Sequence, residues 1–152
     1  MIDITEKSAA VADKEGNDIL VFQEDGLKGE VHTTMPIEKV SVSEQGIVSA
    51  ILKSDTAMKV ICYDTAGNIL VEHKTSLAGS GYPVDVALSA NGQLMQVLYL
   101  YTQDGRIEGR LHYYNLGMQE KIRQIIRLLK RTTRTQLWHP DFLWMRIHRR
   151  NR

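Results

Sequence analysis

"YPVDVALSANGQLMQVLYL", residues 82–100, is the stretch that decides the fold. An alternating, strand-like run leads into the turn "SANG", and a second run rich in apolar and aromatic residues follows it. The glycine supplies the positive φ that a tight hairpin needs, and the neighbouring asparagine tolerates the same conformation. Further turn signals occur at "EGN" (15–17), "EDG" (24–26), "EQG" (44–46), "TAGN" (65–68) and "QDG" (103–105). Turns about 10 residues apart predict an antiparallel all-β meander.

The same order of elements occurs earlier in the chain, in "MPIEKVSVSEQGIVSAIL". Ser43 and Gly46 correspond to Ser89 and Gly92, an offset of 46 residues. A weaker copy opens the chain in "IDITEKSAAVAD". A period of about 40–50 residues with about four strands per repeat is typical of propeller blades.

We therefore expect a mostly β fold, in which residues 1–117 form about two and a half to three consecutive four-stranded antiparallel blades of an incomplete propeller. A short C-terminal basic helix is expected within residues 118–152. Propellers usually close their ring with about four to eight blades. The chain is then an internal fragment of something longer, and its uncovered apolar faces predict self-association through open blade edges.

Charge divides the chain at residue 118. Residues 1–117 carry 9 Lys+Arg and 16 Asp+Glu, a net charge of −7, whereas residues 118–152 carry 10 and 2, a net charge of +8. The segment "IRQIIRLLKRTTR" places its apolar residues on one helical face and its basic residues largely elsewhere. These basic residues are Arg123, Arg127, Lys130, Arg131 and Arg134. Such a tail predicts contact with an anionic membrane surface or a nucleic-acid backbone.

Two other interpretations of the tail stay open. Its apolar stripe could cover a blade edge and so block edge-to-edge pairing. Alternatively, the tail is a frameshift product. Residues 117–121 can be encoded by GGG ATG CAG GAA AAG, and one inserted G gives GGG GAT GCA GGA AAA G, which encodes Gly-Asp-Ala-Gly-Lys, a polar turn. Contact with nucleic acid or membrane is expected only if the tail is genuine.

Catalytic and metal-binding patterns are absent from the sequence. The five histidines pair neither with each other nor with Cys62 at metal-ligand spacing. There is no G-x-S-x-G, no Walker-type loop and no H-E-x-x-H. We expect no enzyme activity, no cofactor and no metal. Glu38 and Asp85 each follow a proline at the expected inner end of a blade, so they are candidate channel-lining residues; turn capping and solvation are the alternative reading.

Cys62 is the only cysteine, which excludes an intrachain disulfide, and its place in "MKVICYD" predicts a small, buried or half-buried side chain. No run approaches the roughly 18 apolar residues of a membrane span. The N-terminus lacks the basic and apolar regions of a signal peptide. The chain as given is therefore expected to be cytoplasmic.

Five successive motifs within residues 3–117 resemble those of an uncharacterised β-propeller-like family of unknown function, with WD40-like or quinoprotein-like repeats, from Gram-positive bacteria. They are "AVAD…G…I.VF…G" (10–26), "T..PI.KV.VS..G.V.A.L" (33–52), "YD..G..L.E.KT" (63–75), "G.P.D.ALS..G" (81–92) and "YLY…G…YN.G" (99–117). In that family one transmembrane helix precedes an extracytoplasmic domain. The resemblance therefore implies a membrane-anchored, extracytoplasmic full-length parent.

The leading functional expectation is a noncatalytic binding or scaffold module, whose partner is an unknown protein or a cell-envelope ligand. The alternative is a basic-tailed module that docks on an anionic membrane or on nucleic acid. A fragment of a propeller enzyme is a third interpretation. That class gathers its site from many blades, so we expect this chain to be too short to hold a cofactor.

Overall fold

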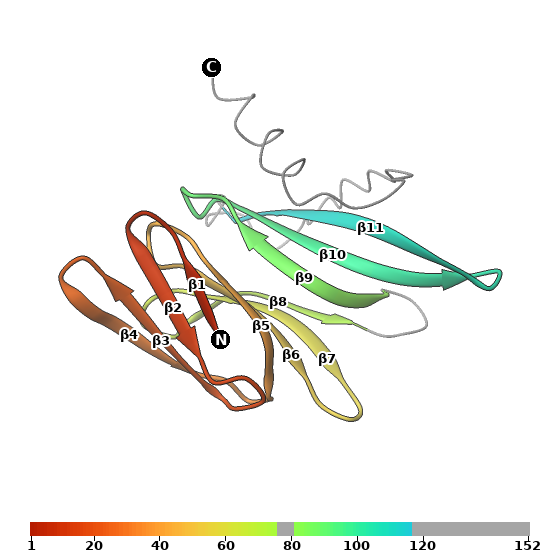
Figure 1. Cartoon of the computed structure of the whole chain (residues 1–152), viewed down its shortest axis with the longest axis horizontal. Coiled ribbons are helices and arrows are strands. Elements are labelled where there is room, and N and C mark those ends of the chain that lie inside the picture. Colours follow the sequence, from red (N-terminus) through yellow and green to blue (C-terminus); the bar gives the residue numbers. More distant parts are fainter. Residues whose placement is uncertain (76–80, 117–152) are drawn as a thin grey trace, which may run out of the picture.

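The computed structural model describes residues 1–75 and 81–116, which form eleven strands in three antiparallel sheets (Figure 1). Sheet A contains β1 (Ile2–Ile4), β2 (Ser8–Ala12), β3 (Asp18–Gln23) and β4 (Gly26–His32). Sheet B contains β5 (Ile37–Val42), β6 (Val48–Lys53), β7 (Met58–Tyr63) and β8 (Ile69–Thr75). Sheet C contains β9 (Tyr82–Leu88), β10 (Leu94–Gln103) and β11 (Arg106–Asn115). Each strand pairs with the next one along the chain, so every sheet is a meander.

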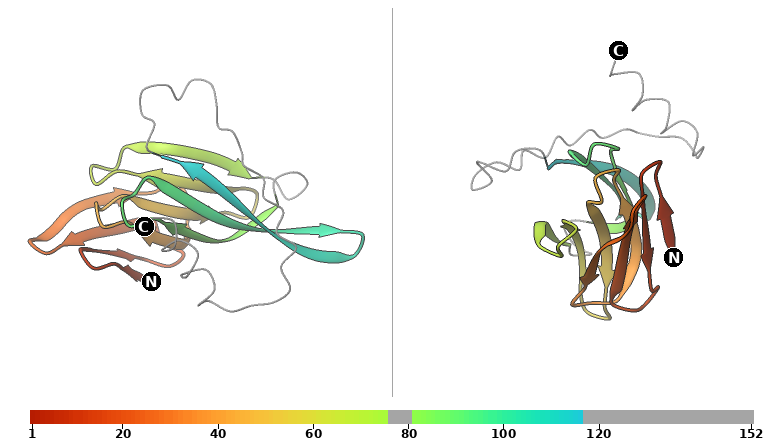
Figure 2. Two further views of the ribbon diagram at one scale, coloured as in Figure 1. Left: turned by 90° about the horizontal axis from the view of Figure 1, so that it is seen from above. Right: turned by 90° about the vertical axis from the view of Figure 1, so that its left-hand side faces the viewer.

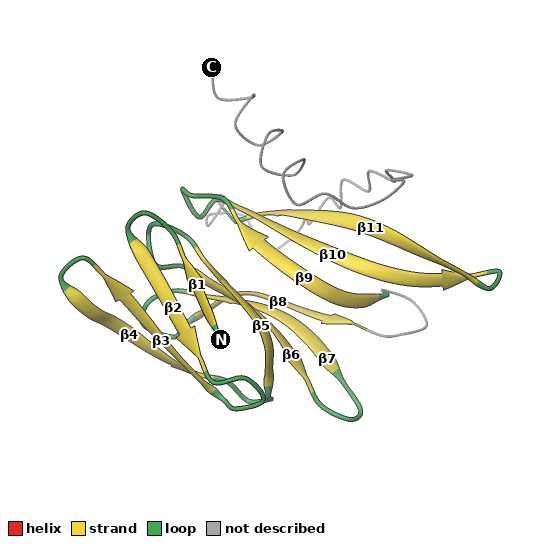
Figure 3. Ribbon diagram, in the orientation of Figure 1, coloured by secondary structure: helices red, strands yellow, loops and turns green. Residues whose placement is uncertain are grey.

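The prediction of two and a half to three four-stranded propeller blades followed by a basic helix is wrong. The described residues form three separate sheets of four, four and three strands, and no helix is present among them (Figure 3). Turn spacing indicates strands and hairpins because these are local features. It does not determine how sheets are arranged, since that depends on packing between residues far apart in sequence. The helix was expected within residues 118–152, which lie outside the described residues.

The two Ser-x-x-Gly sequences form the same turn. The N–H of Gly46 donates to the carbonyl of Ser43 at 3.0 Å, and that of Gly92 donates to the carbonyl of Ser89 at 2.8 Å. Both glycines have positive φ, 80° and 63°. Each serine hydroxyl also accepts an N–H from beyond its glycine, that of Ile47 one residue after Gly46 or that of Leu94 two residues after Gly92. The repeat in the sequence is therefore a repeat of hydrogen-bonded hairpins.

Sheet B lies between sheets A and C (Figure 1), and the ribbon is shown from two further sides in Figure 2. Sheet B buries both of its faces, one in each core. Five of the six residues of β6 are buried, so the strand shows no alternation of buried and exposed residues. Successive side chains of a strand point to opposite faces. Leu52 therefore belongs to the core between sheets A and B, whereas Ile51 belongs to the core between sheets B and C. The fold depends on two cores that share one sheet.

Each sheet has a front face, toward the sheet that precedes it in the chain, and a back face, toward the sheet that follows. The back face of sheet A contributes Ala10, Ala12, Ile19, Val21 and Val31 to the first core. The front face of sheet B contributes Val40, Val42, Val48, Ala50, Ile61 and Tyr63 to it. In the second core, Ile51, Val60 and Cys62 of sheet B meet Val86, Met95, Val97, Tyr99 and Tyr114 of sheet C. The two junctions thus join the sheets front to back, in the same sense.

One hydrogen bond recurs at both junctions. A carboxylate oxygen of Asp3 in sheet A accepts the N–H of Val42 in sheet B at 2.7 Å. The hydroxyl of Ser41 in sheet B accepts the N–H of Leu88 in sheet C at 3.2 Å. Both bonds therefore join the first strand of one sheet to the first strand of the next. They tie β1 to β5 and β5 to β9.

Candidate functional site

Glu38 and Asp85, the two residues predicted to line a channel, both line one open groove of about 470 Å³. The groove runs along the first strands of the three sheets, β1, β5 and β9. Asp3, Lys14 and Lys39 also contribute charged side chains to its wall. The structure thus brings the two predicted residues to one surface.

The charges of this groove are mixed and exposed to solvent. The Nζ atom of Lys39 lies 3.4 Å from Oδ1 of Asp85, and the two side chains are 50% and 58% exposed. An exposed ion pair of this kind contributes little to stability, because water screens it. No group of three or more His, Cys, Asp or Glu side chains that could hold a metal ion occurs in residues 1–75 and 81–116.

The structure also changes how the two repeats align. Matching the prolines pairs Glu38 with Asp85, but the register of the sheets pairs Lys39 with Asp85. Lys39 lies opposite Ile51 and Asp85 lies opposite Leu98, immediately after an irregularity in each strand pair. Because side chains alternate along a strand, an error of one residue moves a side chain to the other face. The two prolines are not equivalent: Pro83 lies opposite Tyr99, whereas Ile37 holds that position in sheet B, opposite Leu52. Matching the prolines therefore did not foresee the ion pair between equivalent positions.

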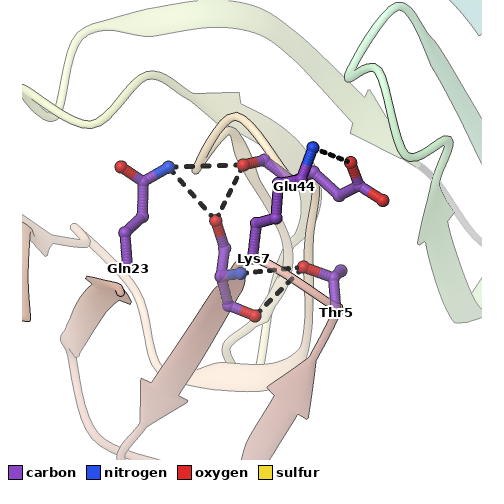
Figure 4. Close-up of polar contacts among 5 residues, drawn as sticks. Thr5, Lys7, Gln23 and Glu44 are labelled. Carbon is purple, nitrogen blue, oxygen red and sulfur yellow. Dashed lines mark hydrogen bonds and ion pairs between the residues drawn. The ribbon is translucent and has the colours of Figure 1, made fainter. Parts of the chain in front are cut away.

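A second polar site lies where the turn before β6 meets sheet A (Figure 4). The backbone carbonyl of Glu44 accepts hydrogen bonds from the Ser8 hydroxyl at 3.0 Å and from the Gln23 amide at 3.3 Å. Its carboxylate lies 3.5 Å from the ammonium group of Lys7. The Glu44 N–H in turn donates to the carbonyl of Ala90 in the next turn. These contacts hold the turns of the three sheets together, which is a structural role.

Cys62 is fully buried between sheets B and C, which confirms the prediction of a small, buried side chain. Burial raises the pKa of its thiol to about 11. The thiol is therefore protonated at neutral pH, and only the thiolate is an effective nucleophile. Cys62 thus has a packing role in this fold.

The most unusual surface is the front face of sheet A, because neither of the other two sheets formed by the described residues covers it. Cross-strand pairing places its side chains in two rows, one containing Ile4, Ala9, Phe22 and Leu27 and the other Ile2, Val11 and Leu20 with Glu30 at its end on β4. Ile2, Ile4 and Leu27 are 64%, 70% and 56% exposed. A contiguous exposed apolar surface on a folded protein indicates an interaction site. Uncovered apolar faces were expected from the sequence, but none of the residues of this face was identified, although the alternation in β3 could have indicated them.

The equivalent residues of sheet B are all buried. In the pairing register, the row Ile4, Ala9 and Phe22 corresponds to the row Val42, Val48 and Tyr63. The row Ile2, Val11 and Leu20 corresponds in the same way to Val40, Ala50 and Ile61. All six residues of sheet B are at most 7% exposed, because they pack on the back face of sheet A. The front face of sheet A is therefore a junction surface of the same design, and residues 1–75 and 81–116 form no further sheet that packs on it.

The predicted anionic-surface residues lie outside the described residues. They are Arg123, Arg127, Lys130, Arg131 and Arg134. No helix in residues 1–75 and 81–116 is long and apolar enough to cross a membrane.

These features define a stack of antiparallel meander sheets whose described residues show an open junction surface and a shallow charged groove. The chain belongs to the family described as "Family of unknown function (DUF5711)", which matches residues 1–132. This confirms the predicted resemblance to a family of unknown function, while the Gram-positive source and the membrane anchor stay predictions. The match ends within the basic tail rather than at residue 117. The curated proteins that were compared contain no match.

Proposed function

We propose that this chain is a noncatalytic assembly module that binds another antiparallel sheet on the front face of sheet A. The observation that supports this function is the correspondence between that face and the buried front face of sheet B. The partner is a protein, because the surface to be covered has the width and side-chain pattern of a sheet. No enzyme activity and no cofactor are part of the proposal.

The exposed side chains set the expected strength of binding. Complete burial of one large aliphatic side chain contributes about 1.5–3 kcal/mol. Ile2, Ile4 and Leu27 together therefore offer several kcal/mol, to which the partly exposed residues beside them add. Association costs at least about 4 kcal/mol of lost translational and rotational freedom. We expect moderate affinity, with association visible at roughly 10–100 µM protein.

The proposal is tested by sedimentation of the full chain over a range of concentrations. Ile4→Asp places a carboxylate on the edge strand β1 of the apolar face, where Ile4 is 70% exposed, and burying that charge is unfavourable. We expect this variant to associate at least about tenfold more weakly than the wild type. Ile69→Asp is the matched control, because Ile69 is 55% exposed on the edge strand of sheet B, away from the front face of sheet A. A wild type that stays monomeric at millimolar concentration, or equal effects of both variants, would contradict the proposal.

A second candidate function is ligand binding in the groove, which the convergence of Glu38, Asp85 and Lys39 favours. Its neighbouring acidic and basic groups suit a ligand that carries both charges. Titration with a lysine- and glutamate-containing dipeptide should shift the amide resonances of Lys39 and Asp85, and Asp85→Ala should abolish those shifts without changing the fold. Most specific sites have dissociation constants well below about 10 mM. Unchanged resonances at about 10 mM dipeptide would therefore count against this function.

A further inference from the structure

We propose that the partner of the front face of sheet A is the back face of sheet C in a second copy of this chain, so that copies associate head to tail. This inference rests on the proposed function and adds the identity and orientation of the partner. It follows from the order of the two junctions inside the chain. Both join a back face to the front face of the next sheet. The described part of the chain begins with an uncovered front face and ends with the back face of sheet C.

The back face of sheet C has the pattern that such a junction needs. Cross-strand pairing places three rows of side chains on it: Ala87, Gln96 and Tyr113; Asp85, Leu98 and Leu111; and Tyr82 and Leu100. Leu98 and Leu111 correspond in register to Ile51 and Val60 of sheet B, which are fully buried against sheet C. Leu98, Leu111 and Tyr113 are themselves only partly buried. A second copy placing its front face here would therefore repeat a junction that the chain already contains twice.

The backbone of β1 carries the other half of the recurring hydrogen bond. The Thr5 N–H donates to the Ser8 carbonyl, and the Ala12 N–H donates to the Met1 carbonyl. Since inward and outward N–H groups alternate in an antiparallel pair, the N–H of Ile4 points away from β2. Ile4 occupies the position of Val42 and Leu88, whose N–H groups bond to the preceding sheet. Its N–H is thus placed to bond to the sheet that covers the front face.

In the head-to-tail arrangement the residue opposite this N–H is Ala87 of the second copy. Ala87 occupies the position of Asp3 and Ser41, the two acceptors inside the chain. Alanine has no side-chain oxygen, so the junction between copies lacks the bond that both internal junctions have. The junction between copies is consequently weaker and reversible. This difference gives the proposal a gain-of-function test.

Mixing two variants tests the orientation. Ile4→Asp blocks the front face, and Leu98→Asp blocks the back face; Leu100→Asp is the second back-face variant, because Leu100 is already 37% exposed. Circular dichroism and thermal melting establish that each variant is folded. Wild-type chains should form a series of growing oligomers, since a heterologous contact leaves both ends free. Each variant alone should be monomeric, and an equimolar mixture should form a one-to-one complex through the two intact faces.

Each alternative outcome identifies what fails. If the folded back-face variants associate as well as the wild type and form discrete dimers, the copies meet front to front, and the head-to-tail inference is wrong while the proposed function survives. If the mixture stays monomeric, the head-to-tail contact is also overturned. If Ile4→Asp associates as strongly as the wild type, the proposed function itself fails.

The acceptor is tested with a pair of side chains of the same shape. Ala87→Thr adds a hydroxyl at the position of Ser41, whereas Ala87→Val adds an equal volume without an acceptor. One added hydrogen bond should make the threonine variant associate about threefold to tenfold more tightly than the valine variant. Within the chain, Ser41→Ala calibrates the same bond through its effect on stability. Equal association of the two variants would show that the N–H of Ile4 does not face Ala87.

Discussion

Truncation of either Leu52 or Ile51 to alanine is expected to lower the free energy of unfolding by about 2–5 kcal/mol. Both side chains are fully buried, although they are consecutive residues of β6. Leu52 fills the core between sheets A and B, and Ile51 fills the core between sheets B and C. Each variant leaves a cavity in one core and loses the burial of several methyl or methylene groups. A strand on the surface of a sheet stack would show a large loss at only one of two such neighbours.

Urea denaturation followed by circular dichroism measures both losses. Ile69→Ala is the control, because Ile69 is 55% exposed and its truncation should change the free energy of unfolding by less than about 1 kcal/mol. A loss below about 1 kcal/mol for Ile51→Ala would mean that sheet C does not cover sheet B in solution. The same result for Leu52→Ala would mean that sheet A does not cover it.

Gly29→Ala is expected to destabilise the protein by about 3 kcal/mol, the upper part of the range for an added methyl group in a close-packed site. A Cβ atom on Gly29 would lie 1.9 Å from the carbonyl oxygen of Thr65, in the connection between β7 and β8. The neighbouring atom belongs to the backbone, so it cannot move aside by a change of rotamer. The strand β4 or the connection must shift, and contacts between sheets A and B are lost.

Gly109→Ala provides the matched comparison within the same protein. Gly109 lies in β11, and its added Cβ would meet only the Cδ1 atom of Leu98 at an ordinary 3.6 Å. Replacing a strand glycine under these conditions should be neutral or stabilising by about 0.5–1 kcal/mol, because glycine loses more conformational freedom on folding. Thermal unfolding of both variants separates the two cases. Equal melting temperatures would show that β4 does not approach the connection at Thr65 so closely.

The hairpins, the meander order and the buried Cys62 could be predicted from the sequence, because turn chemistry and strand composition act locally. The arrangement of the sheets could not be predicted in this way. Nothing near Gly29 in the sequence identifies the carbonyl of Thr65 as its neighbour. The glycine in "GLKGEVH" indicates at most a close backbone approach.

The candidate site likewise could be predicted only in part from the sequence. Glu38 and Asp85 were identified as candidates from the prolines that precede them, and the structure places both at one groove. Their alignment with one another was wrong by one position, because Pro36 precedes β5 whereas Pro83 lies within β9. Uncovered apolar faces at the ends of the β-structure were expected from the sequence, but the residues that form the front face of sheet A were not identified. Its residues alternate as a half-buried strand does, and whether such a face is covered depends on what lies beyond it.

The rate at which the single cysteine of this chain is labelled can report how often its sheets separate. Cys62 points from sheet B into the core shared with sheet C, and its protonated thiol is shielded from reagents in solution. A thiol reagent can therefore label it only in those moments when sheets B and C part, and the rate of labelling counts these openings. Separation of sheet A leaves the thiol covered. The native thiol thus distinguishes separation of sheets B and C from separation of sheets A and B, and no cysteine has to be introduced.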